Sequence, residues 1–167
     1  MSETINLGKI YLKELEAEAE ASRKCLERIS ENLFEYKPHE KSMKLGYLAL
    51  MVAEIPKWLK LIVEDSEIDF ATFKHFEPKT TAELVAHFDE NLASAKEALG
   101  SATDEIFEAN FALKNKGEVL YSSVKKDEIS SAINHLVHHR GQLTVYMRLN
   151  DIAVPSVYGP SADDRSF

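Results

Sequence analysis

The chain has 167 residues, of which 44% are hydrophobic and 29% are charged, and this composition excludes a disordered polar chain. A globular chain of this length buries about two thirds of its unfolded surface, so we expect one domain over residues 1–167. Twenty basic residues against 28 acidic residues give a net charge of −8, which argues against nucleic acid as a partner, because phosphate binding needs a basic surface.

The sequence also favours a particular compartment. No apolar run reaches the roughly 20 residues of a membrane span, and the N-terminal stretch MSETINLGKIYLKELE has no apolar signal-peptide core. We therefore expect a cytoplasmic protein with no membrane partner. Cys25 is the only cysteine, which rules out an intramolecular disulfide and a cysteine-based zinc cluster. A small buried hydrophobe is its expected role, in preference to a reactive thiol.

The first half of the chain predicts two long helices. Residues 7–33 are rich in Glu, Lys, Ala and Leu, with apolar positions at mostly helical spacing. Pro38 breaks this segment, and Ser42 is placed to cap a second helix over residues 43–63. Pro56 lies inside that helix and is expected to bend the turn before it. Apolar residues at spacings of three and four predict one buried stripe: Leu45, Leu48, Val52, Ile55 and Leu59.

The second half predicts two more helices and a short excursion. Residues 64–80 are expected to form a loop, after which Thr80 and Glu83 make a capping-box pattern for a helix to Leu99, with Gly100 just beyond its end. Next come a short helix in TDEIFEAN and a hairpin in FALKNKGEVLYSSV. A last helix is expected over residues 126–150, followed by a C-terminal tail, residues 154–167. Four long amphipathic segments predict an all-α four-helix bundle with a hairpin-like excursion before the last helix.

Three of the six histidines lie in the stretch NHLVHHRGQL, residues 134–143. His135 and His139 are four residues apart, so on a helix both imidazoles project from one side and can converge on one ion. His138 is turned toward the other side, and Gln142 returns to the side of His135. Two histidines are not enough for a catalytic metal site, which normally takes at least three protein ligands. The alternative is that these histidines bond carbonyls or line a partly wet interface.

Two regions, SMKLGYLALMVAEIPKWL at 42–59 and NHLVHHRGQLTVYMRLNDIAVPSVYGPSADD at 134–164, resemble the signature regions of the DinB/YfiT-like superfamily. The resemblance spans nearly the whole chain and includes the hairpin-like stretch before the last helix. It implies a four-helix bundle, commonly dimeric, with a divalent metal such as nickel or zinc held by three histidines. It also implies that relatives include transferases or isomerases that use a low-molecular-weight thiol.

Carried over by position, the resemblance assigns His135 and His139 to the two metal ligands of the last helix. The third ligand belongs where the family has His-Val-Ala-Glu, and this chain has Met51-Val52-Ala53-Glu54. A thioether is a soft ligand that suits copper(I) better than nickel(II) or zinc(II), so Met51 is expected to act as an apolar plug. Glu54 or His87 could substitute as the third ligand. Alternatively, Glu54 could pair with the two imidazoles in a metal-free polar cluster.

Several neighbouring residues have two interpretations. Gly141 fits a helix that a partner passes closely, or a tolerated surface glycine. Tyr158 is expected to pack, although the family pattern suggests that it closes over one end of the bundle. Trp58 and Tyr47 are expected at the core or a dimer interface rather than as stacking platforms. Arg140 and Tyr146 could supply donors near the histidines.

The expected protein is thus a homodimeric DinB-like bundle whose divalent-metal site is degenerate. One alternative is an active metal-dependent enzyme of the thiol-dependent transferase type, in which Glu54 or water completes the shell of His135 and His139. Another is a non-catalytic dimer that binds a small molecule or is purely structural. The sequence offers no nucleophile of its own, so a thiol cosubstrate or a metal-bound water would have to attack.

Overall fold

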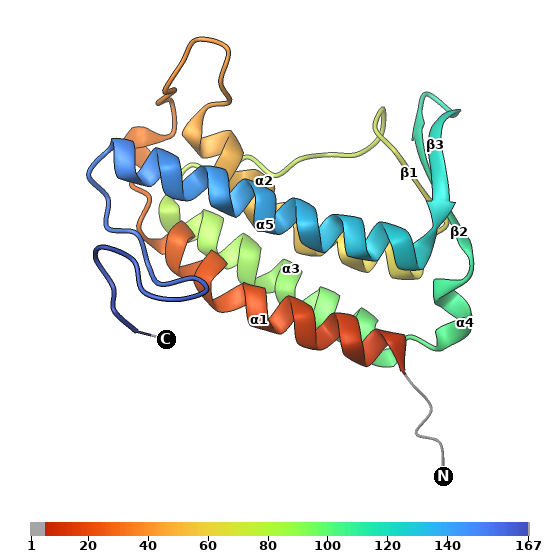
Figure 1. Ribbon diagram of the computed structural model, residues 1–167. Helices are drawn as coiled ribbons and strands as arrows, with labels where there is room; N and C mark the ends of the chain where they lie inside the picture. The colour runs from red at the N-terminus through yellow and green to blue at the C-terminus, as the bar shows by residue number, and fades with distance from the viewer. Residues whose placement is uncertain (1–5, 167) are drawn as a thin grey trace.

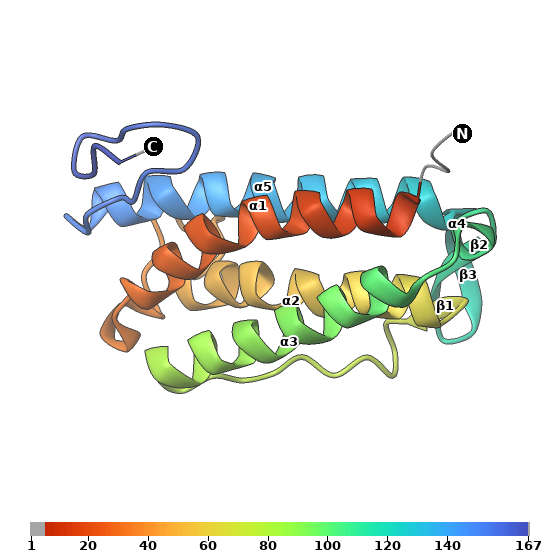
Figure 2. The ribbon, with the colours of Figure 1, turned by 90° about the horizontal axis from the view of Figure 1, so that it is seen from below.

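Four long helices lie side by side in the computed structural model, which describes residues 6–166 (Figure 1). They are α1 (Leu7–Glu27), α2 (Leu45–Glu64), α3 (Thr81–Ser101) and α5 (Lys125–Leu149). Both α1 and α2 pack against α3 and α5, so the four helices enclose a common interior (Figure 2). A short 3-10 helix, Glu31–Leu33, follows α1, and the short helix α4 (Asp104–Phe107) follows α3.

The buried stripe predicted for the second helix is confirmed. Its five apolar residues are almost completely buried, and the same face meets buried apolar side chains from the other long helices. Regular recurrence at three and four residues makes this possible, because it keeps one face of α2 apolar over its whole length. The core is completed from the neighbouring elements by Leu15, Leu26, Leu84, Phe88, Phe107, Phe111, Ile129, Ile133, Leu136 and Leu143, among others.

The capping box predicted for the third helix is also confirmed. The Thr80 hydroxyl accepts a hydrogen bond from the Glu83 backbone N–H at 3.1 Å, and the Glu83 carboxylate accepts from the Thr80 N–H at 3.2 Å. Asn6 plays a similar part for α1, where its side-chain oxygen accepts from the Lys9 N–H at 2.8 Å. Both caps bind backbone N–H groups that the first helical turn leaves without partners.

Other predicted boundaries were wrong. The first helix ends at Glu27 and not at Leu33, because a break separates it from the 3-10 turn. Lys44 is the N-cap of α2 and no side chain caps it, so Ser42 does not have that role. Gly100 lies within α3, which continues to Ser101.

Pro56 lies inside α2, as the sequence predicts. About one turn before it, the Ala53 carbonyl accepts a hydrogen bond at 2.9 Å from Nδ2 of Asn91, a residue of α3.

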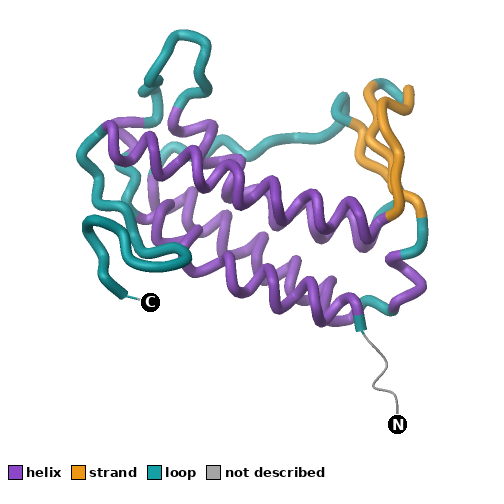
Figure 3. The backbone as a smooth tube through the Cα atoms, in the orientation of Figure 1, coloured by secondary structure: helices purple, strands orange, loops and turns teal. Residues whose placement is uncertain are grey.

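A small three-stranded sheet covers one end of the helices, so the all-α class was wrong (Figure 3). The predicted hairpin is present as β2 (Asn110–Asn115) paired antiparallel with β3 (Glu118–Val124), with Lys116 and Gly117 at positive φ in its turn. The strand β1 (Glu67–Asp69) pairs parallel with β2, in a segment expected to be loop. After β1 a long loop, residues 70–80, runs back along the helices to the start of α3 (Figure 3).

The last helix and the tail agree well with the sequence. The α5 helix begins and ends within one residue of the predicted bounds. The C-terminal tail is held by carboxylates, since Asp163 accepts from the Val154 N–H at 2.9 Å and Asp164 accepts from the Ser156 N–H at 3.2 Å. None of the helices in residues 6–166 is both long enough and apolar enough to cross a membrane.

Candidate functional site

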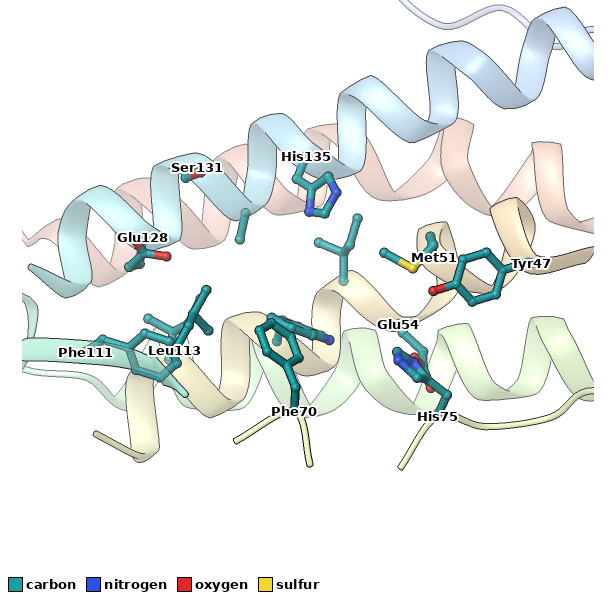
Figure 4. A pocket seen from close by; sticks show the side chains of 14 residues that line it. Tyr47, Met51, Glu54, Phe70, His75, Phe111, Leu113, Glu128, Ser131 and His135 are labelled. Carbon is teal, nitrogen blue, oxygen red and sulfur yellow. The ribbon is translucent and has the colours of Figure 1, made fainter. Parts of the chain in front are cut away.

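A cavity of about 450 Å³ lies between α2, α5, the sheet and the loop that follows β1. We call it the central pocket (Figure 4). This volume lies within the range of small-molecule sites. Apolar and aromatic side chains form most of its wall, and the polar ones are few. Its lining residues are Tyr47, Met51, Glu54, Ile55, Trp58, Ile62, Phe70, His75, Phe111, Leu113, Glu128, Ser131, Ala132 and His135.

Helix α2 supplies one wall because its residues recur at helical spacing. Met51, Ile55, Trp58 and Ile62 are separated by four, three and four residues, which places them along one face. Leu48, Val52 and Leu59 belong to the buried stripe of the core. The helix therefore has two apolar faces, one directed into the core and the other into the pocket.

The loop after β1 contributes the aromatic part of the wall. The ring centroid of Trp58 lies 5.8 Å from that of Phe70 and 5.2 Å from that of Phe73. Phe73 in turn packs edge-on against His75, with centroids 5.0 Å apart. The predicted core or interface role of Trp58 was therefore incomplete, because its side chain also lines the pocket.

Glu54 is buried at the bottom of this wall, with only 1% of its surface exposed. Its Oε2 is 2.6 Å from Nδ1 of His75, and its Oε1 accepts from the Phe76 backbone N–H at 2.8 Å. Oε1 also lies 3.4 Å from Nε2 of His87, which stacks on Phe76 with centroids 4.3 Å apart. These contacts satisfy the carboxylate and fasten the loop to α2.

On the other side of the pocket, α5 contributes His135 (Figure 4). The His135 and His139 rings are close, with centroids 4.4 Å apart, as their spacing predicts. They differ in environment, since His135 lines the pocket and is exposed, whereas His139 is only 5% exposed and its Nδ1 lies 2.8 Å from Oε1 of Gln142. Partial burial of its ring, with charge repulsion from His139 and His138, lowers the pKa of His135 below its usual value of 6.5.

The donor set does not fit the divalent ion that the resemblance implies. Met51 faces the pocket together with His135 (Figure 4), so the position of the expected third imidazole is taken by a soft, uncharged thioether. Glu54 and His87 are engaged with each other and with the loop. Within residues 6–166, no three His, Cys, Asp or Glu side chains are arranged to hold a metal ion.

Glu128 and Ser131 complete the polar lining near the sheet. Glu128 lies in the first turn of α5, and its Oε1 accepts from the Ser123 hydroxyl of β3 at 2.5 Å. Figure 4 shows Glu128 at one end of the pocket and Tyr47 with Met51 at the other. The pocket is therefore elongated, with the Glu128 carboxylate near the sheet and the buried Glu54 carboxylate, paired with the exposed His75 imidazole, near the far end (Figure 4).

Arg140 and Tyr158 lie outside the pocket, on the side of α1. Arg140 is buried and donates from Nη1 to the Glu18 carbonyl at 3.0 Å, while its Nη2 pairs with the Glu18 carboxylate at 2.5 Å and with Tyr158 Oη at 2.7 Å. Tyr158 also donates to that carboxylate at 2.9 Å. The tyrosine therefore ties the tail to α1 and α5 and does not close over the histidines. Tyr146 likewise donates elsewhere, to the Met43 carbonyl at 3.2 Å.

Cys25 has the buried role that the sequence predicts. Its side chain is fully buried in the core, and this desolvation raises the pKa of the thiol to about 11. A protonated thiol without solvent access is a poor nucleophile. None of the residues that line the pocket is a cysteine.

Sequence reasoning missed His75, Phe70 and Glu128. His75 and Phe70 come from a segment without helical periodicity, and His75 meets Glu54 across 21 positions of sequence. Glu128 looks like an ordinary acidic residue in a first helical turn. A faint signal was available in the concentration of aromatic residues around His75, in FATFKHFE.

Comparison with known proteins agrees with the resemblance. The family model described as the DinB family matches residues 1–165. A protein named "Uncharacterized protein YrdA" from Bacillus subtilis is 23% identical over 155 residues, covering 92% of this chain and 89% of its own. Among solved structures, the DinB-like protein YjoA from B. subtilis has a TM-score of 0.67 at 18% identity and covers 94% of this chain and 99% of its own. A DinB-like protein from Bacillus cereus has a TM-score of 0.68 at 21% identity, with coverages of 90% and 97%.

Proposed function

The chain belongs to the DinB family. We propose that its divalent-metal site is degenerate, and that the protein binds a small, largely apolar molecule in the central pocket. The observation that carries the proposal is that Met51 lines the same pocket as His135 (Figure 4). The resemblance implies a third imidazole at the position of Met51. A thioether and two imidazoles form a weak set for nickel or zinc.

The state of Glu54 supports the proposal. A carboxylate that replaced the missing histidine would need a free oxygen directed at His135 and His139. Both oxygens of Glu54 instead bond to the loop, one to His75 and the other to the Phe76 N–H. Recruiting Glu54 as a ligand would break its hydrogen bonds to both of these donors.

The rest of the site suits a binding function. The pocket has a preformed apolar and aromatic wall and a few polar side chains, which is the usual composition of a small-molecule site. The four long helices, each of which packs against two others, support the four-helix bundle as its scaffold.

A metal-dependent enzyme of the thiol-dependent transferase type is the second candidate. The specific observation in its favour is the close approach of the His135 and His139 rings, at 4.4 Å between centroids. The contact of His139 Nδ1 with Gln142 leaves Nε2 as the nitrogen of this imidazole that could face an ion. Any nucleophile would have to come from a cosubstrate or a metal-bound water, because Cys25 is buried in the core.

Metal content and probe binding together test the proposal. We expect protein purified without a polyhistidine tag, from medium supplemented with nickel and zinc, to contain well below one equivalent of metal. We also expect neutral 2-phenylethanol to change the fluorescence of Trp58, the only tryptophan of the chain, because this side chain lines the pocket.

A matched pair of variants locates the binding. Ala132→Phe places a ring into the pocket and should abolish the fluorescence response. Ser130→Phe adds the same ring at an exposed position of α5 outside the lining, and should leave the response intact. One tight equivalent of metal in the wild type would overturn the degenerate-site proposal, and an equal response in both variants would overturn binding in the pocket.

A further inference from the structure

The charged side chains that line the central pocket indicate which charge its ligand should have. Glu54 and Glu128 are the two carboxylates of the lining, and the lining contains no Lys and no Arg. An anionic ligand would therefore meet two negative side chains and no permanent cation. Lys57 directs its Nζ at the ring of Phe73, 4.8 Å from its centroid, and does not line the pocket.

The two carboxylates differ in what they can offer a ligand. Both oxygens of Glu54 accept hydrogen bonds from the protein. Glu128 accepts one, from Ser123 to Oε1, and none of the Lys and Arg side chains in residues 6–166 forms an ion pair with it. Its Oε2 thus remains available to a donor inside the pocket, and the Ser123 bond holds the carboxylate at the pocket end shown in Figure 4.

The aromatic wall complements that carboxylate. Trp58, Phe70 and Tyr47 line the pocket, and rings of this kind pack against the apolar or aromatic body of a ligand. Buried apolar area along Ile55, Ile62 and Leu113 suits the uncharged body of a ligand. A molecule that combines a cationic head with an apolar or aromatic body matches both features.

We propose, on the basis of the binding function above, that the ligand of the central pocket is an organic ammonium with an apolar or aromatic body, and that Glu128 is the residue that selects its charged head. The head lies against the carboxylate of Glu128 near the sheet. The body extends along the aromatic wall toward Tyr47 and Met51.

Glu128 has a structural role that must be separated from ligand recognition. It lies in the first turn of α5, where negative side chains favour the helix macrodipole. Asp127 lies in the same turn and carries the same charge, but it is exposed and does not line the pocket. Asp127→Asn is therefore the control for Glu128→Gln.

Three probes of the same shape test the charge preference: 2-phenylethylammonium, neutral 2-phenylethanol and anionic phenylacetate. Binding is followed by Trp58 fluorescence at low salt. We expect the ammonium to bind about three- to tenfold more tightly than the alcohol, which corresponds to a partly exposed charge contact of about 1 kcal/mol, and phenylacetate to bind most weakly. Raising the salt concentration to about 0.5 M should reduce the preference, since salt screens partly exposed charges.

In Glu128→Gln the ammonium should lose its advantage while the alcohol binds as before, and Asp127→Asn should behave as the wild type. Equal binding of ammonium and alcohol in the wild type, or a preference that Glu128→Gln leaves intact, overturns this inference. If the charge preference is absent but the alcohol still binds in the pocket, this inference fails while the proposed function stands. Failure of all three probes to bind overturns both. The salt comparison needs only wild-type protein, so the test stands even if a variant does not fold.

Discussion

Individual buried polar groups decide how the pocket of this DinB-family protein is built. Glu54 is the clearest case, since it is almost fully buried and its two oxygens hold the His75 ring and the Phe76 backbone. Glu54 ends the stretch Met51-Val52-Ala53-Glu54, where the resemblance implies a histidine ligand in place of Met51. This position made Glu54 a candidate metal ligand. The contacts suggest instead that it orders the loop that forms the aromatic wall.

We predict that Glu54→Gln lowers the free energy of unfolding by about 1–3 kcal/mol, because a neutral amide replaces the charge-assisted hydrogen bonds of the buried carboxylate to His75 and to the Phe76 N–H. Urea denaturation measures the change. Glu64→Gln is the control, since Glu64 forms only an exposed ion pair with Lys60 at 3.7 Å, and such pairs contribute at most about 1 kcal/mol. Equal losses in the two variants would contradict the assignment.

The pKa of His135 gives a pH-dependent prediction. Because its folded pKa is lowered below the ordinary 6.5, the unfolded chain takes up the proton first as the pH falls. This residue should therefore reduce stability as the pH drops from about 6.5 to its folded pKa. We expect an NMR titration of metal-free protein to place its midpoint below 6.5, and His138→Gln to raise that midpoint by removing a positive neighbour. A midpoint above 6.5 would contradict this account.

At the level of elements, local patterns predicted the helices but not their connections. Periodic apolar residues in α2 and the Thr80–Glu83 capping box are local signals, and both were confirmed. The strand β1 could not be recognised in the same way, because its three residues gain their hydrogen bonds from β2, more than forty positions later. The predicted end of the third helix was also wrong, since α3 continues through Gly100 to Ser101.

In the central pocket, too, local sequence patterns predicted some features and missed others. The closeness of His135 and His139 followed from helical spacing alone. The partners of Glu54 could not be predicted, because His75 lies in an irregular loop whose path depends on the tertiary fold. Met51 was identified only through the resemblance, as periodicity cannot distinguish a pocket wall from a core position.

Asp69 joins β1 to the hairpin turn and offers a test of the sheet. Its carboxylate accepts from the Lys116 N–H at 3.0 Å and from the Gly117 N–H at 2.7 Å. In Asp69→Ala we expect these two amides to exchange with deuterium faster than in the wild type, as they lose their acceptors. Glu67→Ala, which removes only an ion pair with Lys114, should leave them unchanged. Unaltered exchange in Asp69→Ala would show that the carboxylate does not hold the turn.

For the whole molecule, the expected homodimer remains a prediction. Helix α5 exposes Val145 and Leu149, 57% and 56% accessible and one turn apart, on a part of the helix that also includes Gly141. A methyl group added at Gly141 would contact nothing within 4 Å in this chain, so no neighbouring helix of the same subunit explains the glycine. This face of α5 is therefore where we place the contact between subunits.

Sedimentation velocity at micromolar concentration tests this prediction. We expect a wild-type dimer and a shift toward monomer in Val145→Glu, because a charge would be buried in an apolar contact. Ile10→Glu changes an equally exposed apolar residue on α1 and should remain dimeric. A monomeric wild type would contradict the dimer, and an unchanged Val145→Glu would contradict its location.

The central proposal for the whole molecule is that Met51 lines the central pocket at the position where the resemblance implies the third metal ligand. The most direct measurement is calorimetric titration of nickel and zinc into the wild type, Met51→His, and the double variant Met51→His/His139→Ala. We expect weak or no binding by the wild type, clearly tighter binding by Met51→His, and loss of most of that gain in the double variant, because only a shared ion couples the two positions. Equal affinity in all three proteins, or tight stoichiometric binding by the wild type that Glu54→Ala abolishes, would contradict the account.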